Sequence, residues 1–348
     1  MTRYPIFDGH NDVLLRLWLK KSTKAVSEFI DGEATGQLDL PRMHDGGFAG
    51  GLFAIYIPSP DDGVDRGGLN PPPYLPVSRE VASRVTLEMA DVLFAMEREV
   101  PNNGFQICRS VADIRSAMAM GSVAAVMHIE GAEAVGADLD GLEKLYAVGL
   151  RSIGPVWSRD NVFGQGVPFQ FPHSPDTGGG LTDAGKALVR ECNRLRIMLD
   201  VSHLNLKGFW VLAGLTDAPI VASHSNVHVL SRSTRNLLDD QLRAIGQSGG
   251  IVGLNYALDF LQDDGAPHPE LPPSEMFRHL DHMLRIAGED CVGLGSDFDG
   301  AAIPEFIKDA SGLPRLVQAM IDAGYSETLI QKITSENWLR VLEKTWGH

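Results

Sequence analysis

The chain has 348 residues, 44% of them apolar and 22% charged, which is enough for a single large α/β barrel or two mid-sized domains. Its formal net charge of -15 disfavours nucleic acid and anionic membrane surfaces as partners, because the long-range field would repel a polyanion. Bound cations would offset part of this acidity.

The three cysteines, Cys108, Cys192 and Cys291, are too few and too scattered for a disulfide framework or a cysteine zinc site. They indicate free, buried thiols in a reducing compartment. The first strand begins near residue 4, which leaves no room for a signal peptide, and no later run approaches about 18 uninterrupted apolar residues. We therefore expect a soluble cytoplasmic protein.

Residues 6–13, Ile-Phe-Asp-Gly-His-Asn-Asp-Val, are predicted to be a strand that ends in metal ligands. Side chains alternate between the faces of a strand, so His10 and Asp12 project the same way and can share one cation. A single His-x-Asp pair is weak evidence, because a chain with 11 histidines and 45 acidic residues contains such pairs by chance. Its meaning depends on where the other candidate ligands lie.

The next segments alternate between helical and strand patterns. Residues 14–30 carry helix-like apolar groupings, and residues 40–43 look like a helix start that the paired Gly46 and Gly47 soon stop. Residues 50–57 predict a buried strand. Residues 59–76, rich in proline and glycine, predict a long loop of the kind that is usually functional or a lid.

Beyond this loop the alternation becomes regular. Residues 77–100 predict a long helix, Ser110 and Asp113 cap a second helix, and residues 123–130 predict the third strand. The later strands are expected at residues 151–157, 197–203, 219–224, 251–256 and 292–297. The later helices are expected near residues 139–148, 182–194, 206–215, 238–247, 273–287 and 314–345.

Eight nearly all-apolar strands alternating with helices predict a closed (β/α)8 TIM-type barrel of parallel strands, with residues 1–348 as one domain. An open doubly wound sheet is the alternative. Against it, the first strand is not followed by a Gly-x-Gly-x-x-Gly turn.

The most chemically suggestive residues all fall at carboxyl ends of predicted strands, the functional face of such a barrel. A buried acid that closes an apolar strand needs a partner to offset its desolvation, and a metal ion is the economical one. Three histidines and three carboxylates exceed the needs of one tetrahedral ion but suit two ions spanned by a carboxylate. These six candidates are His10, Asp12, Glu130, His203, His224 and Asp297.

Several short motifs resemble the membrane (renal-type) dipeptidase family of zinc peptidases, which belongs to the amidohydrolase-like metal-dependent barrels. They occur in the family's order from one end of the chain to the other, which makes the resemblance specific. The matching stretches are Asp8-Gly-His-Asn-Asp12, His128-Ile-Glu130-Gly131, Asp200-Val-Ser-His203, Ser223-His224-Ser225, Arg235-Asn236, Gly295-Ser-Asp297-Phe-Asp299-Gly300 and Asn337-Trp338-Leu339-Arg340.

The resemblance implies two Zn²⁺ ions per chain. It places His10 and Asp12 on one ion and His203 and His224 on the other, with Glu130 as a catalytic bridge between them. Their bridging hydroxide would be nucleophilic at neutral pH, because metals depress the pKa of a bound water to about 7.

The resemblance also assigns the residues that would act on the peptide itself. Asp297 takes the place of the catalytic acid/base, and Asp299 is the next candidate if the proton shuttle lies elsewhere. Arg235, with Asn236 beside it, takes the place that binds the terminal carboxylate of the substrate, since a guanidinium offers a planar fork to a carboxylate. The alternative for Arg235 is a surface salt bridge.

Trp157 departs from the family, which usually has a substrate-contacting histidine at this position. Tryptophan donates one hydrogen bond but cannot become a cation. Either zinc alone polarises the scissile carbonyl, or His128, Arg159 or Asn161 substitutes. For His128 a packed or ligand-supporting role is the favoured interpretation.

We therefore predict a binuclear zinc dipeptidase that cleaves the amide bond of short peptides, with a D-residue tolerated at the C-terminal position. It would bind small peptides, work as a homodimer, and bind neither nucleic acid nor membranes. One alternative is another metal-dependent amide or ester hydrolase acting on N-acyl amino acids or lactones. The other is a metal-bearing binding protein in which Trp157 marks lost catalysis.

Overall fold

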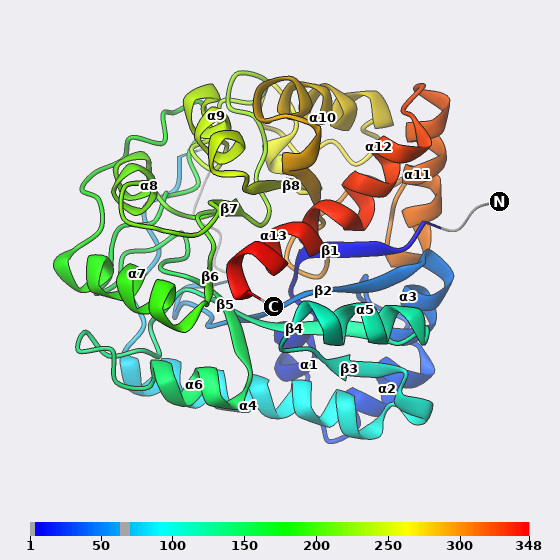
Figure 1. Cartoon of the computed structure of the whole chain (residues 1–348), viewed down its shortest axis with the longest axis horizontal. Coiled ribbons are helices and arrows are strands. Elements are labelled where there is room, and N and C mark those ends of the chain that lie inside the picture. Colours follow the sequence, from blue (N-terminus) through cyan, green and yellow to red (C-terminus); the bar gives the residue numbers. More distant parts are fainter. Residues whose placement is uncertain (1–3, 63–69, 348) are drawn as a thin grey trace.

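A nearly closed barrel of parallel strands forms the centre of the computed structural model, which describes residues 4–62 and 70–347 (Figure 1). The strands are paired in the order β6-β5-β4-β2-β1-β9-β8-β7, and each ladder is parallel. Their bounds are β1 Ile6–Asn11, β2 Phe48–Tyr56, β4 Val123–Glu130, β5 Leu150–Gly154, β6 Met198–Leu199, β7 Val221–Ala222, β8 Ile251–Asn255 and β9 Val292–Gly295.

The seam between β6 and β7 is joined just beyond the regular ladders. Asp200 and Val221 form a parallel bridge, and the amide of Val201 donates to the carbonyl of Val221 at 2.8 Å. The predicted parallel eight-stranded TIM-type architecture is therefore confirmed. Closure places the carboxyl ends of all eight strands around one rim, where the candidate residues were expected.

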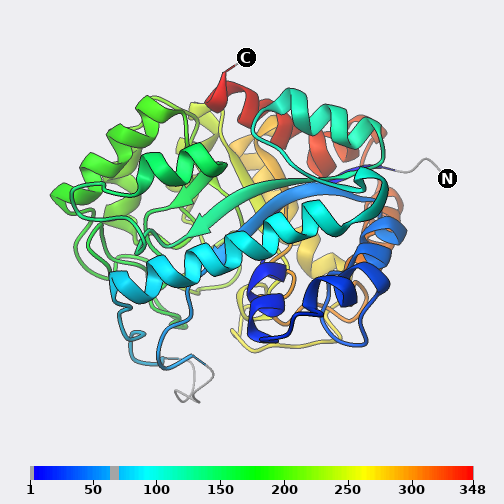
Figure 2. The ribbon, with the colours of Figure 1, turned by 90° about the horizontal axis from the view of Figure 1, so that it is seen from below.

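Helices surround the barrel, and the longest, α4, lies along the outside of the strands beside α1 and α2 (Figure 2). Among the described residues no helix has both the length and the apolar content needed to cross a bilayer. The helices are α1 Val13–Leu19, α2 Ala25–Asp31, α3 Leu40–Gly46, α4 Arg79–Glu99, α5 Val111–Ala119, α6 Leu142–Val148, α7 Asp183–Leu195, α8 Leu206–Ala213, α9 Asp239–Ser248, α10 Pro273–Ala287, α11 Leu313–Asp322, α12 Glu327–Gln331 and α13 Asn337–Trp346. Single turns of tighter or wider helix are η1 Pro101–Asn103, η2 Leu258–Phe260, η3 Glu289–Cys291, η4 Ala310–Gly312 and the π-helical η5 Lys332–Glu336.

The helix boundaries follow local chemistry. The Asp39 side chain accepts from the amide of Arg42 at the start of α3, and Gly47 ends that helix in the left-handed region at φ 70°. Ser110 and Asp113 make the predicted capping box on α5. Such reciprocal caps satisfy backbone groups that a helix end otherwise leaves unpaired.

The structure corrects several of the sequence expectations, and one expected loop lies partly outside the described residues. The helix expected at residues 14–30 is two helices, because Lys21 takes a left-handed backbone at φ 50° and turns the chain. An unpredicted three-residue strand, β3 (Phe105–Ile107), pairs with β4. The strands expected at residues 197–203 and 219–224 shorten to β6 and β7, because the chain leaves the ladder to form the site. Of the expected loop at residues 59–76, residues 63–69 lie outside the described part of the chain.

The C-terminal helix α13 fastens β1 to β9. Trp338 is fully buried against Phe7, with ring centroids 6.3 Å apart, and its indole N–H donates to the carbonyl of Leu294 at 2.9 Å. A Cβ on Gly9 would lie 2.4 Å from the Trp338 ring, so only glycine permits this approach. The buried indole thus lies directly below the strand that carries His10.

Candidate active site

Three of the predicted ligands meet around one carboxylate oxygen. Glu130 is the last residue of β4, while His203 and His224 lie in the loops that follow β6 and β7. The Nε2 atoms of His203 and His224 lie 2.9 and 3.4 Å from Oε1 of Glu130 and 3.2 Å from each other. All three side chains are buried. Two imidazole nitrogens and a carboxylate oxygen facing one point are a zinc-type donor set.

His10 and Asp12 form a second group around the same glutamate. His10 Nε2 lies 3.2 Å from Oδ2 of Asp12 and 3.7 Å from Oε1 of Glu130. His10 is on β1, and Asp12 is the residue directly before α1. Glu130 therefore belongs to both groups of potential metal ligands, the arrangement that a bridging carboxylate requires.

Asp297 completes the rim from the loop after β9. Its ligand-type oxygen lies within 4.8 Å of nitrogens on His10 and His224, and Asn255 donates an amide hydrogen to its Oδ2 at 2.9 Å. Asp297 has φ 61°, in the left-handed region that a non-glycine residue rarely occupies. Strained backbone of this kind clusters at functional sites.

The electrostatics favour a cation at this rim. Burial, together with the charges of Arg235 and His10, holds the pKa of His203 well below its usual range, and the pKa of His224 is depressed in the same way. Their imidazoles are therefore neutral, the form that binds metal. Burial raises the pKa of Glu130 to about 8. A bound divalent ion would reverse this effect by favouring the carboxylate.

His10 carries the opposite shift. Burial opposes its charged form, but the neighbouring carboxylates Glu130 and Asp12 outweigh burial and raise its pKa to about 10. Burial also raises the pKa of Asp297. The carboxyl groups of Asp12, Glu130 and Asp297 lie close together here, and positive charge stabilises their ionised forms. The residues present therefore fit metal ions in both number and type of donor.

Arg235 faces the same point and is not a surface residue, since it is only 2% exposed. Its Nη1 donates to Ser225 Oγ and its Nη2 to the carbonyl of His224, both at 2.9 Å, while Nη2 lies 3.1 Å from His203 Nε2. The Nε of Arg235 has no partner among the described residues. Burial lowers its pKa to about 10, which still leaves the guanidinium charged at neutral pH.

A cavity of about 530 Å³ opens over this rim. One wall is aromatic: the Trp157 ring lies 4.9 Å from that of Tyr56, 4.6 Å from that of Tyr74 and 5.8 Å from that of His203. Phe169 packs edge-on to Trp157 at 5.5 Å. Tyr74 comes from the described part of the loop that the sequence marked as a candidate lid.

Asn236 does not line this cavity. Its side-chain amide donates to the carbonyls of Ser231 and Phe260, both at 2.9 Å, and so fixes the loop that carries Arg235. Trp157, by contrast, forms part of the cavity wall.

The residues considered as substitutes for the missing histidine are engaged elsewhere. Arg159 is fully buried and pairs with Glu133 at 2.8 Å, and Asn161 bonds within its own loop to the carbonyl of Pro155. His128 lies below the rim. Asp299, the alternative proton shuttle, pairs with Arg16 at 2.9 Å.

Sequence reasoning missed the hydroxyls that support the ligand histidines. Ser158 Oγ lies 2.8 Å from Nδ1 of His203, and Ser223 Oγ lies 2.7 Å from Nδ1 of His224. Ser223 directly precedes His224, so its position was a usable signal, but Ser158 is 45 residues from His203 and only the fold brings them together. Partners of this kind fix the tautomer of a metal-binding histidine.

Comparison with known proteins extends the resemblance to nearly the whole chain. Residues 1–346 match the family described as membrane dipeptidase (peptidase family M19). An uncharacterized protein encoded in the PQQ-III 3' region of Acinetobacter calcoaceticus is 41% identical over 287 residues, which cover 81% of this chain and 90% of that protein.

Solved structures agree with this result. A metallopeptidase from Rhodobacter sphaeroides, liganded with a phosphinate mimic of the dipeptide L-Ala-D-Ala, superposes with a TM-score of 0.95 at 53% identity and covers 99% of this chain and 100% of its own. The probable dipeptidase PvdM from Pseudomonas aeruginosa has a TM-score of 0.84 at 27% identity and covers 99% of this chain and 96% of its own.

Proposed function

Because the chain belongs to the membrane dipeptidase family, peptidase family M19, and is thus a metal-dependent dipeptidase, we propose that it hydrolyses dipeptides at a binuclear zinc centre on the barrel rim. The observation that carries this proposal is the meeting of two ligand groups at Glu130, inside a cavity that also contains a buried arginine.

His10 and Asp12 would hold one ion and His203 and His224 the other, with Glu130 shared between them. When bound, such a pair of ions supplies Lewis acidity and an activated water at neutral pH. The protein contributes the neutral imidazoles of His203 and His224. Ser158 and Ser223 hold these rings in place through hydrogen bonds to their Nδ1 atoms.

Asp297 would move the proton. Its carboxylate lies beside His10 and His224, and Asn255 orients it through Oδ2. In the proposed reaction it takes a proton from the attacking water and delivers it to the departing amine. Burial raises the pKa of Asp297 in the metal-free site.

Arg235 would bind the free carboxylate of the C-terminal residue. Its Nε has no partner among the described residues, and the donors already in use hold the guanidinium plane fixed. A charged donor with spare capacity, buried next to the ligands, would select substrates whose carboxylate lies one residue beyond the scissile bond.

The aromatic wall would shield the reaction from bulk water. Tyr56, Tyr74, Trp157 and Phe169 cover the side of the cavity next to His203. The L-Ala-D-Ala mimic bound by the Rhodobacter sphaeroides relative supports a D-residue at the C-terminal position of the substrate here as well.

The test combines metal analysis with a substrate panel. We expect two zinc ions per chain, and we expect L,L- or L,D-dipeptides to be hydrolysed faster than N-acyl amino acids and lactones. Glu130→Gln should lower metal content and abolish turnover, because both ligand groups share this carboxylate. Full activity with one ion per chain would contradict the bridged pair.

The two alternative functions give different results in the same panel. Faster turnover of N-acyl amino acids or lactones would favour the broader hydrolase. Two bound ions with saturable dipeptide binding and no turnover of any compound would favour a binding protein.

A further inference from the structure

Asp200 is a buried carboxylate directly below the ligand rim, just after β6, and it is 3% exposed. Its Oδ1 accepts hydrogen bonds from the amides of Ser202 and Ser223 at 3.0 and 2.9 Å and from the Ser202 hydroxyl at 2.7 Å. Its Oδ2 accepts from the Ser223 hydroxyl. These four hydrogen bonds stabilise the ionised form of the carboxylate.

One hydrogen-bond chain leads from Asp200 to His224. If the Nε2 of His224 binds a metal, its proton is on Nδ1, which then donates to Ser223 Oγ at 2.7 Å. The Ser223 hydroxyl in turn donates to Asp200 Oδ2. The chain fixes both the tautomer and the orientation of the ring.

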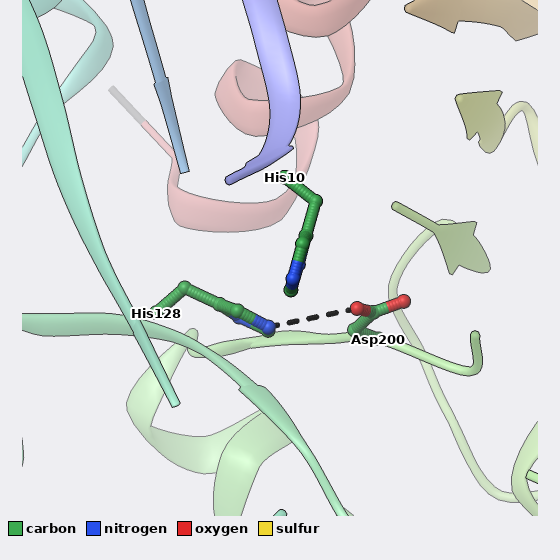
Figure 3. A group of neighbouring side chains, drawn as sticks. All are labelled: His10, His128 and Asp200. Atoms are coloured by element: carbon green, nitrogen blue, oxygen red, sulfur yellow. Dashed lines mark ion pairs between the residues drawn. The ribbon is translucent and has the colours of Figure 1, made fainter. Parts of the chain in front are cut away.

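A second connection leads from Asp200 towards His10. Figure 3 shows the His10 ring pointing at the gap between His128 and Asp200, where His128 Nε2 lies 3.6 Å from Asp200 Oδ2. The ligand-type atoms of the three residues all lie within 4.8 Å of one another. Within the described part of the chain, His10 Nδ1 and His128 Nε2 have no hydrogen-bond partner.

These two unpaired atoms and Asp200 Oδ2 would together satisfy the hydrogen bonds of one water molecule. His10 Nδ1 would donate to the water, and the water would donate to Asp200 Oδ2 and His128 Nε2. His128 is then neutral with its proton on Nδ1, where Ser152 Oγ lies at 2.8 Å. A buried water needs two to four polar partners, and three are available here.

We propose that Asp200 is a positioning residue for both halves of the metal centre, acting on His224 through Ser223 and on His10 through a buried water shared with His128. The inference rests on the proposed binuclear site and deepens it. Because one carboxylate supports a ligand of each ion, its loss should lower the binding affinity for both ions.

The test measures zinc affinity, not activity. Metal-stripped protein is titrated with zinc against a chromogenic chelator, and two binding steps are resolved. His10→Ala and His224→Ala assign each step to its ion, since each variant lacks a ligand of only one of them.

Four variants then separate the contributions of the residues in this network. Partners of metal ligands are commonly worth about 10–100-fold in affinity. We expect Asp200→Asn to weaken both steps by about that factor. Ser223→Ala should weaken only the step that His224→Ala removes, and His128→Leu only the step that His10→Ala removes. His128→Gln, which keeps a polar group near the water, should recover part of the loss.

Asp39→Asn is the matched control. Asp39 is a buried carboxylate that accepts backbone amides at the start of α3, outside the rim. This variant should lose thermal stability but bind zinc as tightly as wild type. If Asp200→Asn does not fold, the separate steps weakened by Ser223→Ala and His128→Leu decide the question.

Three results would overturn the inference while leaving the proposed function intact. The first is wild-type affinity for both ions in Asp200→Asn, and the second is loss of the same step in Ser223→Ala and His128→Leu. The third is an additional ion in wild type that disappears in His128→Leu, because it would show a cation in place of the water. Fewer than two ions in wild type would contradict the binuclear site itself.

Discussion

At the scale of single residues, a variant of Asp297 distinguishes a role in proton transfer from a role in metal binding. Asp297→Asn keeps the size of the side chain but cannot accept a proton. Zinc content should therefore stay near two ions per chain, while kcat falls by about 10²–10⁴-fold, the usual contribution of a placed acid or base. Metal analysis and steady-state kinetics on one preparation check this.

Two outcomes would reassign the residue. Loss of an ion in Asp297→Asn would make it a ligand, which its distance from His10 and His224 permits. Normal turnover would require another proton shuttle. Asp299 would then have to leave its ion pair with Arg16.

Arg235 should determine how strongly kcat/KM depends on the length of the substrate. Amidating the C-terminal carboxylate of a dipeptide removes a charge-assisted contact of roughly 1.5–3 kcal/mol, or about 10–150-fold in kcat/KM. Tripeptides should be equally poor, because their carboxylate would lie one residue too far away. Kinetics on a dipeptide, its amide and the tripeptide should show these penalties in wild type and much smaller ones in Arg235→Ala.

Arg235→Lys is the matched control for this effect. It keeps the charge but loses the planar fork, so its penalty for the amide should fall between those of wild type and Arg235→Ala. Equal turnover of the three substrates by wild type would show that Arg235 does not bind the carboxylate.

The sequence identified rim residues but not the residues that support them. His10 and Glu130 were recognisable because polar side chains at the end of an apolar strand are unusual. Ser158 and Asp200 were not recognisable as supports. Serine and aspartate are common loop residues, and their partners become visible only when the strands close into a barrel.

At the scale of elements, the loop after β9 depends on Gly300. A Cβ at this position would lie 2.2 Å from Oδ2 of Asp12 and 2.6 Å from Oδ1 of Asp297. Gly300→Ala should therefore displace both carboxylates, weakening the ion held by Asp12 and lowering kcat by at least about tenfold. Zinc titration and kinetics measure the two effects.

Gly324→Ala provides a contrast, since a Cβ there would meet no atom within 4 Å. Gly324 has φ 88°, so alanine there costs backbone strain. Its Tm should fall while zinc affinity and kcat stay at the wild-type values. Unchanged zinc binding in Gly300→Ala would show that the loop can move aside.

Strand existence was predictable from the sequence, but several strand ends were not. Apolar runs such as residues 123–130 and 251–256 are buried on both faces, which gives a clear signal. The ends of β6 and β7 depend on where Asp200 and Ser223 turn inward to bond each other, and residue pattern does not encode that. The helix break at Lys21 was hidden for a similar reason, since lysine favours helix and the left-handed turn is imposed by packing.

At the scale of the whole molecule, the protein is acidic, and several of its buried carboxyl groups lie together at the barrel rim. The chain has a formal net charge of -15, yet most of its ionisable residues are exposed, and the rim is where several carboxyl groups are buried together. The barrel supplies the apolar surroundings that make this costly without a cation. Stability of the metal-free protein should therefore depend on pH.

Glu130 gives the sign of that dependence. Its pKa rises from 4.5 to about 8 in the folded protein, so between these values the folded state binds more protons than the unfolded state. Stability of the metal-free protein then falls as pH rises through this window, by up to about 1.4 kcal/mol per pH unit. His10 acts in the same direction at higher pH, because the stability from its raised pKa is lost between 6.5 and about 10.

Thermal denaturation of chelator-stripped protein between pH 5 and 9 measures this slope. Glu130→Gln should flatten it, because glutamine does not titrate and no longer stabilises the charged form of His10. Zinc should restore stability most strongly at the high end of the range, where deprotonated ligands bind it best. If the Tm of the metal-free wild type did not change across this range, the buried carboxylates of the rim would not destabilise the folded protein. The metal affinity of the site would then come from ligand geometry alone.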